Sequence, residues 1–154
     1  MTNPISRRAL LARGALFAVG ASSVGRLLHA ATRKTAMLVY KDPNCGCCEK
    51  WVTLMRGAGF EVSVQNTTDM DAIKRRYAIV PALASCHTAL VGGYVIEGHV
   101  PADLILKVLA EKPKLVGLAL PGMVTGSPGM EGPNPQHYDI LALNRGKPTV
   151  YARR

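Results

Sequence analysis

The chain has 154 residues, of which 48% are hydrophobic, and a formal net charge of +9. A chain of this size can bury one ordinary hydrophobic core, which argues against several domains. Residues 1–30 hold four of the 19 basic residues and no acidic residue, so the remainder has 15 basic and 10 acidic residues and a net charge of only +5. The single dense basic run, Lys74 to Arg76, is expected to form a solvated helix face, and no nucleic-acid partner is expected.

Residues 1–30 have the pattern of an export signal. The pair Arg7 and Arg8, which resembles the twin-arginine type, precedes an apolar stretch that ends in small residues. The apolar run from Gly14 to Gly25 has 12 residues, whereas a membrane span needs about 20. We therefore predict cleavage near residue 30, no stable membrane span afterwards, and a periplasmic location.

The chain then alternates between strand and helix patterns. The continuous apolar run over residues 35–40 predicts a strand buried on both faces. Apolar residues at helical spacing begin at Cys48, and glycines after residue 56 end this first helix. Residues 60–65 alternate between apolar and polar, which predicts a second strand, and a capping sequence at residues 67–69 predicts a second helix.

A hairpin, a third helix and a long loop follow. Residues 87–91 and 94–97 are predicted strands joined by a Gly-Gly turn, and a helix is predicted from Pro101 to Pro113. Residues 121–133 are too rich in Gly and Pro for regular structure, and loops of this length in compact domains are usually functional. Residues 138–143 and 148–151 read as a final strand pair.

This order of elements resembles the thioredoxin-like fold, which also has cysteines at the first strand-to-helix junction and a proline before the third strand. We predict an α/β domain over residues 31–154 with a mixed sheet flanked by helices, a Gly/Pro-rich loop and a C-terminal strand pair. The resemblance implies that Pro81 faces Cys45 and Cys48. It also implies that Cys86 lies near the cysteines of the first helix.

Three of the four cysteines lie within residues 45–48. Cys45 and Cys48 have the Cys-x-x-Cys spacing of dithiol redox proteins, but Cys47 adds a thiol that such a pair does not need. Thiolates select Cu(I), Zn(II) or iron–sulfur clusters, and a helix N-terminus stabilises their negative charge. With Cys86, four sulfurs are available to one site.

Copper(I) suits this pattern better than other metals. A zinc ribbon would have two separated Cys-x-x-Cys pairs, a haem-attachment motif would have His where this chain has Glu49, and iron–sulfur ligands are usually further apart. Closely spaced thiolates can also bridge several Cu(I) ions.

Other interpretations stay open. The cysteines are also compatible with two structural disulfides, as in many exported proteins. His87 and His99 are as compatible with ordinary strand-end positions as with metal ligands. Met123 is a less certain candidate ligand, because loop methionines often pack onto a core.

Several motifs together resemble the CopG-type copper-resistance family of Gram-negative bacteria, formerly a domain of unknown function. They are Cys45-Gly46-Cys47-Cys48, Val80-Pro81, Ser85-Cys86-His87-Thr88-Ala89, Glu97-Gly98-His99-Val100-Pro101-Ala102, and the Gly/Met-containing runs within residues 117–131. The resemblance implies an exported thioredoxin-like domain that binds copper through its cysteines, as a multinuclear Cu(I)–thiolate cluster, and interconverts copper oxidation states.

We therefore predict a periplasmic copper-binding protein that serves copper tolerance. The predicted ligands are Cys45, Cys47, Cys48 and Cys86, with His87 and Met123 as less certain additions. The expected partners are copper ions and other periplasmic copper-handling proteins. The alternative is a thiol–disulfide oxidoreductase in which Cys45 attacks a substrate disulfide and Cys48 resolves the product. The sequence does not decide whether the chain is an enzyme.

Overall fold

The structure is a computed structural model that describes residues 34–154, so the predicted export signal lies outside the described residues. Strands and helices alternate along the first two thirds of this region, as the sequence predicts. The elements are β1 (Thr35–Lys41), α1 (Gly46–Gly57), β2 (Phe60–Asn66), α2 (Met70–Arg76), η1 (Pro81–Leu83), β3 (His87–Val91), β4 (Tyr94–Glu97), α3 (Ala102–Glu111), β5 (Gly117–Ala119), β6 (Asp139–Leu143) and β7 (Thr149–Arg153).

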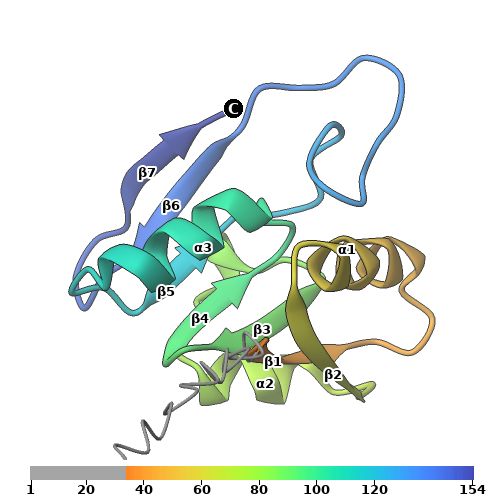
Figure 1. Cartoon of the computed structure of the whole chain (residues 1–154), viewed down its shortest axis with the longest axis horizontal. Coiled ribbons are helices and arrows are strands. Elements are labelled where there is room, and N and C mark those ends of the chain that lie inside the picture. Colours follow the sequence, from red (N-terminus) through yellow and green to blue (C-terminus); the bar gives the residue numbers. More distant parts are fainter. Residues whose placement is uncertain (1–33) are drawn as a thin grey trace, which may run out of the picture. The chain divides into compact units, whose positions relative to one another are not determined.

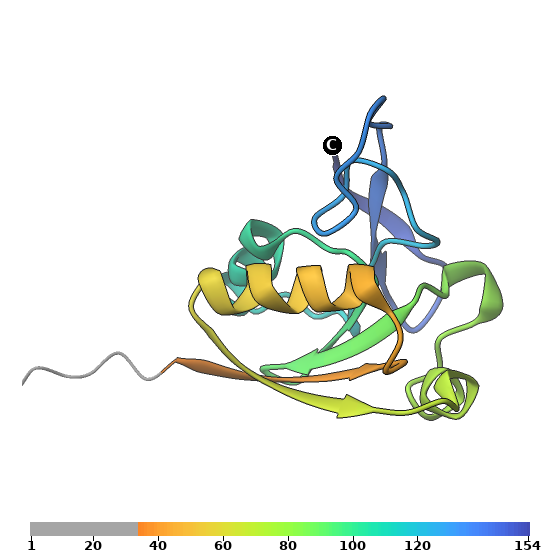
Figure 2. The ribbon, with the colours of Figure 1, turned by 90° about the vertical axis from the view of Figure 1, so that its right-hand side faces the viewer.

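The strands form one mixed seven-stranded sheet in the order β2-β1-β3-β4-β5-β6-β7 (Figure 1). β1 pairs parallel with β2 and antiparallel with β3, and β4 pairs antiparallel with β3 and parallel with β5. Helices α1 and α3 cover one face of the sheet, and α2 lies on the other face (Figure 2). The predicted α/β class, with a mixed sheet flanked by helices, is confirmed.

The core forms between the sheet and the apolar faces of α1 and α3. The buried residues of α1 are Cys48, Trp51, Val52 and Met55, which are the positions that helical spacing marked in the sequence. Three of these residues, Trp51, Val52 and Met55, form a single cluster with Leu104, Ile105 and Val108 of α3 and with Met37 and Val39 of β1. Because Cys48 belongs to this buried stripe, packing of α1 fixes the cysteine motif at the edge of the core.

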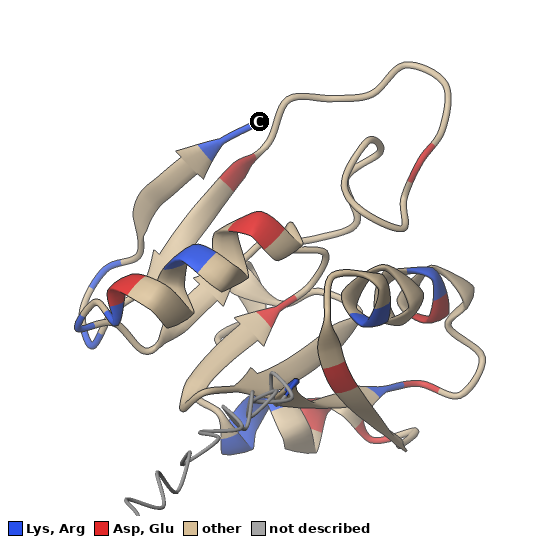
Figure 3. Ribbon diagram, in the orientation of Figure 1, with Lys and Arg blue, Asp and Glu red and all other residues tan. Residues whose placement is uncertain are grey.

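Two features differ from the prediction. The sequence did not predict β5, because three residues are too short to show a period; this strand joins the C-terminal pair to the sheet. Lys74 was expected on a solvated helix face, but it is 7% exposed and bonds to the buried Glu97. Elsewhere, basic and acidic residues are interspersed along the described ribbon (Figure 3).

Pro81 is exposed and opens η1, five residues before Cys86. Cys86 directly precedes β3 and lies beside the cysteines of α1, as the resemblance implied. That Pro81 faces Cys45 and Cys48 stays a prediction. Among residues 34–154, no helix is long and apolar enough to cross a membrane.

Candidate metal centre

The turn between β1 and α1 presents the cysteine motif. Asp42 organises this turn, because its carbonyl oxygen accepts from the backbone N–H of Cys45 at 3.1 Å and its Oδ1 accepts from that of Asn44 at 2.8 Å. Cys45 is the N-cap residue of α1, but its side chain makes no capping hydrogen bond. Its sulfur therefore remains available to the neighbouring cysteines.

Strand register explains why Cys86 meets this motif. β1 and β3 are antiparallel, and Lys41 at the end of β1 is paired with His87 at the start of β3. Residues that follow β1 and residues that precede β3 consequently emerge at the same edge of the sheet. Cys86 thus lies beside cysteines that are about 40 positions earlier in the sequence.

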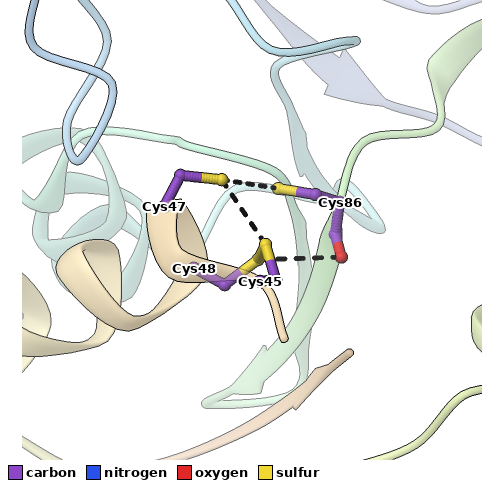
Figure 4. A group of neighbouring side chains, drawn as sticks. All are labelled: Cys45, Cys47, Cys48 and Cys86. Carbon is purple, nitrogen blue, oxygen red and sulfur yellow. Dashed lines mark hydrogen bonds between the residues drawn. A yellow bond between two sulfur atoms is a disulfide. The ribbon is translucent and has the colours of Figure 1, made fainter. Parts of the chain in front are cut away.

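The four sulfurs form one cluster, with all ligand atoms within 4.8 Å of one another (Figure 4). Cys45 and Cys48 are joined by a disulfide, whereas Cys47 and Cys86 are free. The Sγ of Cys47 lies 3.4 Å from that of Cys45 and 3.9 Å from that of Cys86. The structure therefore has one disulfide, whereas a purely structural role for all four cysteines predicts two.

Two histidines extend the cluster on the side of Cys86. The Sγ of Cys86 lies 3.1 Å from Nε2 of His99 and 3.5 Å from Nδ1 of His87. Both imidazole rings are fully buried, and they meet edge to face at 4.9 Å between centroids. Cys86, His87 and His99 thus form a second group of donors that shares one sulfur with the four-cysteine cluster.

Burial keeps both histidines neutral at neutral pH. It lowers the pKa of His87 well below its usual value, and the neighbouring His99 and Lys74 lower it further. Burial also lowers the pKa of His99, partly offset by its hydrogen bond to the Pro128 carbonyl. A neutral imidazole has a free nitrogen lone pair, which is the form that binds metals.

Cys86 is a protonated thiol in the metal-free chain. Burial raises its pKa to about 12, and the adjacent Cys47 contributes in the same direction. Metal binding at this sulfur must therefore displace a proton, as it does at other thiolate sites.

The Gly/Pro-rich loop of residues 121–133, here called the covering loop, lies against the N-terminal part of α1. Gly129 has a φ of +83° and lies so close to α1 that a Cβ there would be 2.9 Å from the backbone N of Trp51. A cleft of about 570 Å³ between the loop and α1 is lined by Cys47, Lys50 and Met130, among others. This cleft gives solvent a route to Cys47.

The structure brings Cys45, Cys47, Cys48 and Cys86 into one group and places His87 in a second group with Cys86 and His99. That these residues bind a metal stays a prediction. Met123 is 60% exposed, and its role as a ligand stays a prediction. The sequence did not decide whether His99 is a metal ligand or an ordinary strand-end residue. His99 follows the predicted strand of residues 94–97 by two positions.

This chain resembles known proteins in sequence and in fold. A family model described as "Protein of unknown function, DUF411" matches residues 83–130. Two solved structures, described as copper resistance protein CopG in form 2 and form 1, are each 41% identical to this chain and cover 79% of it and 98% of their own chains. Their TM-scores are 0.74 and 0.73. The search of curated proteins gave no match. The chain therefore belongs to the DUF411 family and is a homologue of the copper resistance protein CopG.

Proposed function

We propose that this chain is a periplasmic copper-binding protein for copper tolerance, which holds Cu(I) through Cys45, Cys47, Cys48 and Cys86. The observation that carries the proposal is the convergence of four sulfurs within 4.8 Å. Thiolates are soft donors that favour Cu(I), and four of them at this spacing can bridge more than one ion. The neutral nitrogens of His87 and His99 supply additional donors beside Cys86.

The Cys45–Cys48 disulfide links this proposal to redox chemistry. Only two of the four sulfurs are thiols while the disulfide is intact, so binding through all four requires its reduction by two electrons. Conversely, oxidation of the Cys45 and Cys48 thiols to the disulfide releases two protons and two electrons, and these two electrons reduce two Cu(II) ions to Cu(I). We accordingly propose that the chain can interconvert copper oxidation states at this site.

The fold supports the same proposal. The order β1-α1-β2-α2-β3-β4-α3, with α1 and α3 on one face, agrees with a thioredoxin-like core to which β5, β6 and β7 are added. In such a core the N-terminus of the first helix is the reactive end. We further propose that residues 1–30 direct export.

Metal analysis of the reduced, anaerobically purified chain tests the proposal. We expect bound Cu(I) at neutral pH and a lower copper-to-protein ratio when both Cys47 and Cys48 are replaced by Ser. A matched control replaces Thr53, an exposed hydroxyl-bearing residue of the same helix α1, with Ser. An unchanged ratio in the double Cys variant would contradict the proposal.

A second candidate function is thiol–disulfide exchange with a protein substrate. The specific observation in its favour is that Cys48 is fully buried whereas Cys45, at the N-cap, is half-buried. This gives an accessible attacking sulfur and a protected resolving one. Insulin-disulfide reduction that survives Cys47→Ser and is lost in Cys45→Ser would support this function, whereas copper binding should weaken in both variants.

A further inference from the structure

A buried carboxylate, that of Glu97, lies next to the segment that carries Cys86. Glu97 ends β4 and is fully buried. Its Oε1 accepts from the backbone N–H of Ser85 at 2.7 Å and from Nζ of Lys74 at 2.5 Å, and its Oε2 accepts from the hydroxyl of Thr88 at 2.7 Å. Lys74 also donates to the Thr88 hydroxyl at 2.9 Å.

The groups that Glu97 binds are located on both sides of Cys86 along the chain. Ser85 directly precedes Cys86, and Thr88 follows it by two positions and is paired with Glu97 across the β3–β4 hairpin. The backbone N–H of Gly98, the next residue after Glu97, donates to the carbonyl of His87 at 3.0 Å. The segment that carries Cys86 is thus held before and after its sulfur by one carboxylate and its neighbour.

Stability alone is a weak reason for this arrangement. Burying a carboxylate and an ammonium costs solvation energy, and apolar residues of similar size often stabilise a fold equally well or better. A satisfied polar network does, however, specify one geometry, because each of its hydrogen bonds has a preferred direction and length. The position it specifies here is that of the turn from η1 into β3.

We propose that Glu97 is a positioning residue of the metal site, which acts through Ser85 and Thr88 to hold the sulfur of Cys86. This inference rests on the proposed metal-binding function and deepens it. The held position is the one in which Cys86 Sγ lies 3.9 Å from Cys47 Sγ and 3.1 Å from His99 Nε2. Without the hydrogen bonds of Glu97, the chain can still fold, but the sulfur of Cys86 no longer has a fixed position.

Two variants test the inference. Thr88→Val keeps the side-chain shape but removes the hydroxyl, and Glu97→Gln keeps the shape but removes the charge. We expect each to lower Cu(I) affinity, measured by competition with a chromophoric chelator, by about ten- to a hundredfold, as for residues that orient ligands at other metal sites. In the reduced metal-free chain, we expect iodoacetamide to modify Cys86 several times faster, because the sulfur is no longer held against His99.

Tyr94→Phe is the matched control. It removes a hydrogen bond from the opposite end of β4, where the Tyr94 hydroxyl donates to the carbonyl of Pro113 at 3.1 Å. Unfolding in urea gives the loss of stability in every variant. We expect Tyr94→Phe to lose stability without a change in copper affinity or in Cys86 alkylation, whereas Thr88→Ser, which retains the hydroxyl, should lie closer to the wild type than Thr88→Val.

The outcomes separate the inference from the proposed function. If the wild-type chain binds no Cu(I), the proposed function fails, and the alkylation rate of Cys86 alone decides the inference. If Thr88→Val and Glu97→Gln change only the urea midpoint, Glu97 is a structural residue and the inference is overturned. If Glu97→Gln does not fold, Thr88→Val gives the same test without disturbing a buried charge.

Discussion

The imidazole of His99 connects the covering loop to the sulfur of Cys86. Its Nδ1 lies 2.7 Å from the carbonyl oxygen of Pro128, and its Nε2 lies 3.1 Å from the Sγ of Cys86. A carbonyl oxygen only accepts hydrogen bonds, so Nδ1 carries the ring proton and Nε2 presents its lone pair to the sulfur. This is the arrangement of metal-binding histidines, in which a backbone acceptor fixes the tautomer and leaves the other nitrogen free.

His99→Phe is therefore expected to weaken copper binding while largely preserving the packing of the ring. We expect a loss of Cu(I) affinity of about tenfold or more, since even groups that only orient ligands contribute this much at other sites. Trp51 is the only tryptophan, and its ring centroid lies 4.4 Å from that of His87. Quenching of its fluorescence on copper addition gives the titration curve.

The exposed His137 provides the control for this experiment. His137→Gln removes an imidazole that is outside the cluster, so its titration curve should match that of the wild type. If His99→Phe also matches the wild type, His99 has no part in copper binding.

Much of this site could be predicted from the sequence because the order of elements resembles a known fold. An antiparallel pair between the first and third strands brings Cys86 to the cysteine motif. The order of strands and helices did not give this pairing, but its resemblance to the thioredoxin-like fold implied that Cys86 lies near the first-helix cysteines. His99 could not be assigned in this way. Its tautomer depends on Pro128, 29 residues away in a loop whose Gly/Pro composition shows no period.

The buried ion pair between Lys74 and Glu97 could not be predicted from the sequence either. Lys74 belongs to a run of three basic residues, which most often marks a solvated surface. Its partner is 23 positions away on a strand, and only the packing of α2 against the sheet brings the two together. β5 was missed for a different reason, since Gly117–Ala119 is too short to show a strand period.

The number of reactive thiols should depend on the redox state of the chain. The structure predicts two free thiols, Cys47 and Cys86, while the Cys45–Cys48 disulfide is intact, and four after reduction. Thiol counting in denaturant checks these numbers, and peptide mapping checks the pairing. We expect reduction to raise the amount of Cu(I) bound, because it adds two thiolate donors. Equal copper binding before and after reduction would show that Cys45 and Cys48 are not ligands.

The stability of the reduced, metal-free chain should fall in mild acid. Burial lowers the pKa of both His87 and His99, whereas histidines of the unfolded chain titrate near 6.5. Below about pH 6.5 the unfolded state therefore binds protons that the folded state does not, and the free energy of unfolding decreases by up to about 1.4 kcal/mol per pH unit for each histidine. Above this range their contribution is constant.

Urea unfolding between pH 5 and pH 8 measures this dependence. Burial also raises the pKa of Glu97, so protonation of Glu97 in acid favours the folded state and offsets part of the effect of the histidines. The difference between variants in how stability changes with pH is therefore more informative than the slope of any one protein. His99→Phe removes one of the two histidines and should have a shallower decrease in stability below pH 6.5 than the wild type. An identical slope in the two proteins would contradict the assignment to His99.

Gly129 determines how closely the covering loop approaches α1. Its φ of +83° is unfavourable for other residues, and a Cβ would lie 3.0 Å from the carbonyl oxygen of Cys47 and 2.9 Å from the backbone N of Trp51. Gly129→Ala should therefore lower the free energy of unfolding by about 1–3 kcal/mol. It should also displace the neighbouring Pro128 from His99, so copper affinity should fall together with stability. Gly146→Ala is the control, because a Cβ there meets no atom within 4 Å. If Gly129→Ala loses stability but binds copper as the wild type does, then Pro128 does not orient His99 for the metal.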